Sequence, residues 1–174
     1  MALMKASQLS KLEYGPYYKG YIDLAGNDLL IDGLTNSLKE HLDFFNSIPE
    51  EKMNWAYAEG KWTIKELIVH LIDTERVFAY RALRCARQDK TDLPGFDQDE
   101  YVEASGANER SSKDIIEEYQ SVRETTIHLY RSFTETMMEE IGTANGNPMS
   151  PRALGFIMIG HERHHANIIK ERYL

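Results

Sequence analysis

SPRALGFIMIGHERHHANIIKERYL, residues 150–174, is the stretch that decides the fold of this chain. Ser150 suits the position before a helix, because its hydroxyl can accept a hydrogen bond from a free backbone N–H, and Pro151 suits the first helical position. After that start only Gly155 and Gly160 weaken a helix, and neither residue forbids one. The stretch therefore predicts a closing helix that continues to the last residues.

Two histidines lie near the middle of the predicted buried face of this helix. At about 100° per residue, His161 and His165 share a sector about 120° wide with apolar side chains, and they lie about 6 Å apart along the axis. The apolar members of the sector are Leu154, Ile157, Met158, Ile168 and Ile169. A lone buried histidine is usually a hydrogen-bonded core residue, but two neutral imidazoles one turn apart can ligate one metal ion. The pair favours a metal site, with His164 at the edge of the face.

Three further amphipathic patterns precede this helix. The first spans about residues 26–48 and ends at Pro49. The second runs from about residue 63 to residue 88, and its start is marked by Thr63 and Glu66, which form a capping box. The third opens at Ser111 and is predicted to end at Gly142. The sequence shows no strand pattern.

Four such helices predict an all-α protein, a four-helix bundle with a single domain over residues 1–174. Residues 1–25 form an irregular lead-in with aromatic side chains that could pack on the bundle. Residues 89–110 form a long loop without a clean period, and loops of this length are usually functional lids or disordered segments. Leu93, Phe96 and Tyr101 favour an ordered loop that covers something.

Composition excludes several classes of partner. The net charge of −8 disfavours nucleic acid and anionic membranes, because both are polyanions. No apolar run approaches the ~18 residues of a membrane span, and the first residues lack the apolar core of a signal peptide. Cys85 is the only cysteine, so an intrachain disulfide is impossible and a reducing cytoplasm is the natural compartment. We expect a cytoplasmic protein that acts on a small molecule.

The histidine pair needs a third ligand to make an open metal site. Residues 161–165 read as H-E-x-x-H, the zinc-protease pattern with Glu162 as general base. Those proteases require a ligand further downstream, and Glu171, the only acid after His165, faces the opposite side of the helix. His70 is the best-placed upstream candidate, because a facing helix can complete a three-histidine set that leaves one position free. His41 borders an apolar face and is interpreted as structural.

The order of these motifs resembles the DinB/YfiT-like superfamily. The matching segments are Lys61-Trp62-Thr63, Val69-His70-Leu71-Ile72-Asp73-Thr74-Glu75 and Gly160-His161-Glu162-Arg163-His164-His165. The resemblance covers about residues 25–174. It implies a bundle of up-down-down-up connectivity, often a homodimer, with a divalent metal, typically zinc or nickel, on His70, His161 and His165. Some relatives are thiol-dependent transferases or isomerases that use a low-molecular-weight thiol, and others are labelled metal-dependent hydrolases.

Four further residues are candidates for supporting roles. Glu162 could act as a base or hold a ligand in place, and Glu66 or Asp73 could orient His70. Each acid has an ordinary alternative, since Glu66 already belongs to the capping box, and Asp73 and Glu162 could simply be solvated. Arg81 could hold an anionic substrate or pack against the acidic strip.

Three hypotheses follow for the function. The first is a metal-dependent enzyme, either a hydrolase or a thiol-dependent transferase. The second is a non-catalytic dimeric bundle, although three histidines without a fourth protein ligand argue against a closed structural zinc site. The third is a small-molecule binding module that uses a cavity under residues 89–110.

Overall fold

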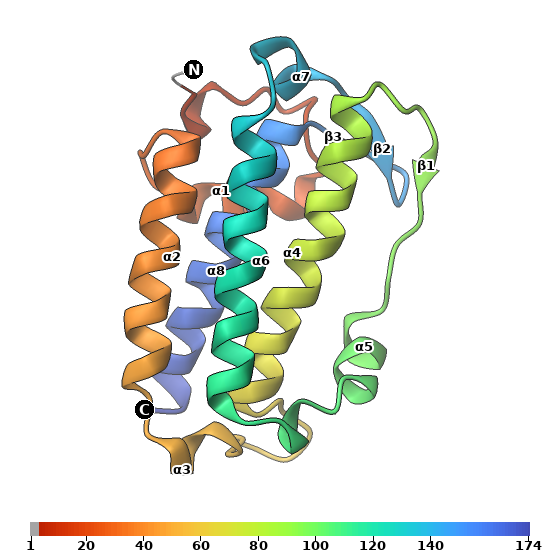
Figure 1. Cartoon of the computed structure of the whole chain (residues 1–174). Coiled ribbons are helices and arrows are strands. Elements are labelled where there is room, and N and C mark those ends of the chain that lie inside the picture. The colour runs from red at the N-terminus through yellow and green to blue at the C-terminus, as the bar shows by residue number, and fades with distance from the viewer. Residues whose placement is uncertain (1–3) are drawn as a thin grey trace.

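The computed structural model describes residues 4–174, and four long helices form its bundle (Figure 1). The long helices are α2 (Leu30–Ser47), α4 (Ile64–Ala86), α6 (Ser112–Arg131) and α8 (Pro151–Arg172). The short helix α1 (Lys19–Leu24) precedes them, and the short helices α3 (Glu50–Met53), α5 (Gln98–Ala104) and α7 (Glu135–Glu139) lie in the connections between them. Three single turns of 3-10 helix are η1 (Ala6–Gln8), η2 (Pro16–Tyr18) and η3 (Ala107–Glu109). The predicted four-helix bundle is confirmed.

The connectivity is up-down-down-up. Figure 1 shows α2 and α8 running in one direction and α4 and α6 in the other. α4 packs against α6 and α8, and α2 packs against the same two helices, so the consecutive helices α2 and α4 lie diagonally across the bundle. Because α4 and α6 are parallel neighbours, residues 87–111 must travel the whole length of the bundle between them. The long loop predicted at 89–110 is this return connection.

Capping side chains set the starts of three long helices as predicted. The Thr63 hydroxyl accepts a bond from the Glu66 N–H, and the Glu66 carboxylate accepts one from the Thr63 N–H, which completes the capping box. Ser111 accepts from the N–H of Asp114, and Ser150 from the N–H of Ala153. Each cap satisfies a donor that the helix leaves free, so the first residue of each helix is well defined.

A small sheet corrects the prediction that the chain has no strands. β2 (Gly142–Ala144) pairs antiparallel with β3 (Asn147–Met149), and the return connection adds β1 (Asp92–Leu93) parallel to β2. Strands of two or three residues are too short to show an alternating pattern. The Asn145-Gly146 turn joins β2 and β3 with φ values of 51° and 69°, which is the geometry of a tight hairpin turn.

The third long helix also ends earlier than predicted. It stops at Arg131 instead of continuing to Gly142. The Thr134 hydroxyl accepts a hydrogen bond from the N–H of Met137 and thereby starts the separate short helix α7. A capping residue inside an amphipathic pattern has divided one predicted helix into two.

The lead-in contributes a helix that crosses the bundle. α1 lies against α8, and the backbone of Tyr21 passes directly over Gly160. A Cβ atom at position 160 would lie 1.7 Å from the Tyr21 carbonyl oxygen, so only glycine permits this approach. The approach brings residues 17–21 beside the predicted ligand His161.

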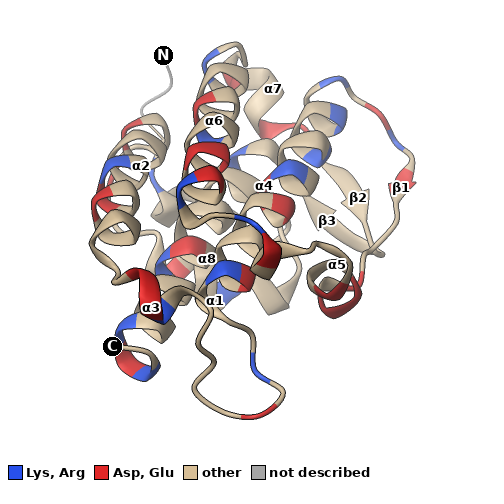
Figure 2. Cartoon of the chain, turned by 60° about the horizontal axis from the view of Figure 1, so that its bottom comes forward, with Lys and Arg blue, Asp and Glu red and all other residues tan. Residues whose placement is uncertain are grey.

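The charged residues lie mainly on the outer faces of the helices, and acidic residues gather on α5, the helix within the return connection (Figure 2). Apolar side chains of the long helices fill the interior of the bundle as two clusters, one around Leu34 and Ile157 and the other around Phe45 and Ile68. Within residues 4–174, no helix combines the length and the apolar content that crossing a membrane would require.

The close approach at Gly160 generates a prediction about stability. Gly160→Ala should lower the free energy of unfolding by about 1–3 kcal/mol, because the added methyl meets backbone that cannot rotate away. Urea denaturation measures the change. Gly20→Ala is the matched control, since a Cβ there meets nothing within 4 Å and should leave stability unchanged or slightly higher. Equal stability of the two variants would contradict the packing of α1 on α8.

Candidate metal centre

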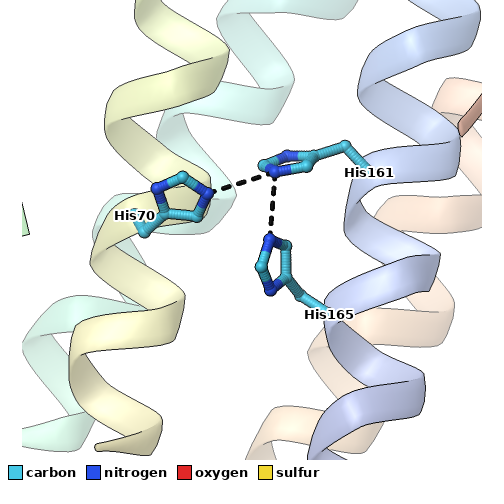
Figure 3. A group of neighbouring side chains, drawn as sticks. All are labelled: His70, His161 and His165. Carbon is cyan, nitrogen blue, oxygen red and sulfur yellow. Dashed lines mark hydrogen bonds between the residues drawn. The ribbon is translucent and has the colours of Figure 1, made fainter. Parts of the chain in front are cut away.

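Three buried imidazoles converge between α4 and α8 (Figure 3). The Nε2 atom of His161 lies 3.1 Å from Nε2 of His70 and 3.0 Å from Nε2 of His165. One ligand atom from each ring can be chosen so that all three lie within 4.8 Å of one another. The three side chains are at least nine-tenths buried. The residues that the sequence predicts as ligands therefore meet at one point.

Neighbouring rings fix how these imidazoles are turned. Trp62, which precedes α4, packs its indole against His70 with 4.8 Å between ring centroids. Tyr21 on α1 meets His161 edge-to-face at 5.1 Å, an arrangement that the crossing at Gly160 makes possible. The Thr74 hydroxyl lies 3.5 Å from Nδ1 of His70, one helical turn further along α4. With Nδ1 turned toward Thr74, Nε2 of His70 points to α8.

Burial keeps the three imidazoles neutral. It lowers the pKa of His70 to about 4 and, with help from the neighbouring imidazoles, the pKa of His165 to about 3. Burial also lowers the pKa of His161 far below its ordinary value, and His165 and His70 add to this shift. Neutral imidazole nitrogens carry the lone pairs that metal ions bind, so the cluster is ready for a cation at neutral pH.

The spacing of the nitrogens fits a metal ion better than a hydrogen-bonded cluster. Zn–N bonds of about 2.0–2.1 Å in tetrahedral geometry place two ligand nitrogens about 3.3 Å apart, close to the two observed separations. A proton on one Nε2 can serve only one hydrogen bond, whereas a cation at the common point accepts lone pairs from all three rings. The residues present therefore fit a divalent metal ion held by three histidines.

Two cavities open beside the imidazoles. One, of about 180 Å³, has His70 and His161 in its wall and is bounded by α1, α4 and residues 96–98 of the return connection. The other, of about 230 Å³, has His165 in its wall together with Trp62, Tyr57 and Tyr173. Nδ1 of His165 is buried without a hydrogen-bond partner among the described residues. Small molecules thus have space on both sides of the cluster.

Glu162 belongs to a different buried network, which contradicts the idea that it is solvated. Its carboxyl group accepts hydrogen bonds from the hydroxyls of Ser37 and Tyr119, and one oxygen lies 3.1 Å from the Arg123 guanidinium. Burial raises the pKa of this carboxyl group well above its ordinary value, and the nearby Glu75 carboxylate adds to the shift. The hydrogen-bond partners of Glu162 lie on α2 and α6, whereas His161 and His165 face α4. The carboxyl group of Glu162 is therefore held by this network and makes no contact with the imidazole cluster.

The structure also gives other partners to the remaining predicted residues. Glu66 accepts a hydrogen bond from the side-chain amide of Asn108 in addition to its capping bond, and a carboxylate oxygen of Asp73 lies 3.6 Å from the Arg76 guanidinium. The group beside Nδ1 of His70 is the Thr74 hydroxyl, so neither acid orients this imidazole. Arg81 is buried and donates to the carbonyl oxygen of Pro94 at 2.8 Å, which anchors the return connection.

Three further histidines lie outside the cluster, and one of them, His128, is exposed on α6. His41 is buried, with Nδ1 2.8 Å from the Ser37 carbonyl oxygen, in agreement with its structural interpretation. His164 is partly exposed at the edge of the face and packs against Tyr21.

Sequence reasoning missed Arg123, Glu75 and Tyr21. Arg123 and Glu75 lie on the inner faces of α6 and α4 and are buried, but a charged residue on an amphipathic helix normally indicates a solvated position. Tyr21 lies in a segment too short for a periodic signal. One signal could have been used: Gly160, next to His161 within a helix, indicates a close backbone approach at that point.

Comparisons with known proteins agree with this geometry. The family profile described as "DinB superfamily" matches residues 34–169. A protein of Oceanobacillus iheyensis, whose name provisionally assigns it as a metal-dependent hydrolase, is 27% identical over 143 residues, which cover 80% of this chain and 79% of the relative. The solved structure of YfiT from Bacillus subtilis matches this chain with a TM-score of 0.66 and 15% identity. The match covers 94% of this chain and 87% of YfiT, which is described as a probable metal-dependent hydrolase with an unusual four-helix bundle topology. The last match shows the shared fold.

Removal of single imidazoles tests the metal centre. We expect His70→Ala, His161→Ala and His165→Ala each to lose stoichiometric metal after dialysis, because two imidazoles alone hold a divalent ion weakly. His164→Ala is the matched control, since this neighbouring histidine is outside the cluster and its loss should leave the metal content unchanged. Elemental analysis of the purified proteins gives the readout. Equal metal content in His164→Ala and His161→Ala would contradict the assignment of ligands.

The lowered pKa values predict a weak pH dependence of metal affinity. If the three imidazoles had ordinary pKa values of about 6.5, protonation of each would lower the affinity of the site for the metal about tenfold at pH 5.5. The three together would lower it about a thousandfold. Because the pKa of His70 is about 4 and that of His165 about 3, protons should compete with the metal only as the pH falls toward these values. Competition titrations with a zinc-sensitive dye should give dissociation constants that agree within about threefold from pH 7 to pH 5.5. A steep loss over that range would mean that the rings are solvated.

Proposed function

The chain belongs to the DinB superfamily, and from this membership and its converging imidazoles we propose that it is a metal-dependent hydrolase with a three-histidine site. The observation that carries the proposal is the meeting of three neutral Nε2 atoms beside two cavities. The relative from Oceanobacillus iheyensis and the fold shared with YfiT support it.

The chain's own residues supply holding, orientation and shielding. His70, His161 and His165 would hold the ion through Nε2, and the Thr74 hydroxyl can accept a hydrogen bond from Nδ1–H of His70 in the tautomer that leaves Nε2 unprotonated. When bound, a divalent ion supplies Lewis acidity to a substrate carbonyl and lowers the pKa of water. Trp62 and Tyr21 pack against the imidazoles and reduce the access of bulk water.

Zinc and nickel are the ions that we propose for the site. Neutral imidazoles suit both, and three protein ligands leave a position free, as in catalytic zinc sites. A low-molecular-weight thiol as the acceptor in place of water, and the homodimer expected from the resemblance, remain predictions. So do the non-catalytic bundle and the binding module, which are outcomes of the experiment below.

Turnover with and without metal tests the proposal. We expect the zinc- or nickel-loaded protein to hydrolyse members of a panel of small esters and amides, and His161→Ala to lower kcat/KM at least 100-fold because the ion is lost. The same panel assayed with added cysteine or glutathione separates hydrolysis from transfer to a thiol. Metal binding without turnover in either assay would favour a binding module, and protein without metal would favour a structural bundle.

Glu162→Gln is the informative control in this assay. Glutamine keeps the size of the side chain. Its oxygen can accept from Ser37 and Arg123, which share one carboxylate oxygen of Glu162, and its amide N–H can donate to the Tyr119 hydroxyl oxygen. The side chain points into this network and not to the metal centre. We expect kcat/KM to fall by less than about threefold, which is below the effect of losing a general base. A loss of about 100-fold or more would restore Glu162 as the base that its H-E-x-x-H context suggests.

A further inference from the structure

The smaller cavity beside the metal centre is walled mainly by aromatic rings. It has a volume of about 180 Å³, and His70 and His161 form the side next to the metal centre. The aromatic residues of its wall are Tyr17, Tyr18, Tyr21, Phe78 and Phe96. They come from three separate segments: η2 and α1, the middle of α4, and the return connection. The aromatic wall is thus assembled only by the folded chain.

The rings of the wall contact one another edge-to-face. Tyr17 and Tyr18 have centroids 5.2 Å apart at 83°, and Tyr18 and Phe78 have centroids 6.0 Å apart at 81°. Tyr21 continues the series to His161 at 5.1 Å and 87°. Perpendicular neighbours of this kind offer both ring edges and ring faces to a guest, which is the arrangement that a further aromatic ring prefers.

Among residues 4–174, no Lys, Arg, Asp or Glu side chain forms part of the cavity wall. Its polar members among the described residues are the tyrosine hydroxyls, Thr74, Gln98 and the two imidazoles. The nearby guanidinium of Arg81 donates to the Pro94 carbonyl oxygen and lies over the Phe78 ring. The second cavity differs, because Lys61 and Asp99 line it.

The size of the cavity matches one ring. An apolar protein cavity of about 150 Å³ accommodates benzene, so about 180 Å³ holds a single six-membered ring and a small substituent. Tyr17 is 75% exposed, which places the outer end of the wall at the surface and the imidazoles at the inner end. A ring bound here would direct its substituent either to the metal centre or to solvent.

We propose that this cavity binds one uncharged aryl group of the substrate, with the reacting substituent turned toward His70 and His161. The assignment of the aryl group to a substrate rests on the proposed function. The preference of the cavity for aryl over alkyl rings is independent of that function. Edge-to-face contacts between aromatic rings stabilise binding beyond the burial of apolar area, so one or two such contacts give an aryl ring about a tenfold preference over a saturated ring of similar size.

The first experiment measures ring preference in the full-length protein as purified. Benzamide and cyclohexanecarboxamide are titrated while amide chemical shifts are recorded, with an expected ratio of dissociation constants of about ten in favour of benzamide. Phe96→Leu, which keeps apolar volume but removes one ring, should reduce the ratio to about three or less. Phe133→Leu is the matched control, because Phe133 is a buried phenylalanine outside the cavity, and it should keep the full ratio. Equal binding of the two amides, or shifts that map away from α1 and residues 96–98, overturns the proposal.

The second experiment connects the cavity with the metal. Benzohydroxamate, cyclohexanecarbohydroxamate and acetohydroxamate, which all chelate zinc, are titrated into the zinc-loaded protein by calorimetry. We expect benzohydroxamate to bind about tenfold more tightly than the cyclohexyl compound, and Phe96→Leu to remove most of this difference. If zinc strengthens none of the three, the metal proposal fails, and the amide titration still decides on the aryl cavity. If zinc strengthens all three and the zinc-loaded protein binds benzohydroxamate and the cyclohexyl compound with equal affinity, the metal proposal stands and the aryl proposal is wrong.

Discussion

The fold depends on a buried arginine that must be paired. The guanidinium of Arg123 on α6 is 1% exposed, and its Nε and Nη2 groups donate to the Glu75 carboxylate on α4 at 2.8–3.0 Å. A third nitrogen donates to Glu162 on α8, and Ser37 on α2 completes the network. An unpaired charge at this depth would cost several kcal/mol, so each helix must keep the one rotation that leaves every partner in place.

That constraint also positions the metal centre. Glu162 points toward α2 and α6, and its neighbour in the sequence, His161, is turned about 100° around the helix and faces α4. His165, one turn later, faces the same way. Residues of the charge network and of the imidazole cluster therefore lie on two faces of α8. The rotation of α8 about its axis that lets Glu162 pair with Arg123 also places Nε2 of His161 3.1 Å from Nε2 of His70.

The sequence was informative where structure is local and periodic. Thr63, Ser111 and Ser150 act as caps because their hydroxyls serve donors only three residues away. His70, His161 and His165 could be predicted as a group because helical spacing restricts which face each occupies, and the family resemblance supported the same set. The partners of Glu162 and Arg81 could not be predicted, because they come from distant segments and a charged residue has the same sequence appearance whether buried or solvated. The sheet and α1 were missed because elements of two to six residues leave no period to detect.

The crossing of α1 over α8 has a consequence for how specificity is distributed along the chain. The segment shared with the superfamily profile begins at residue 34, whereas α1 and the tyrosines before it precede that boundary. The three imidazoles and most of the bundle lie within the matched segment, and one wall of the aromatic cavity lies before it. Substitutions at residues 17–21 can therefore reshape one wall of this cavity while the three imidazoles stay unchanged.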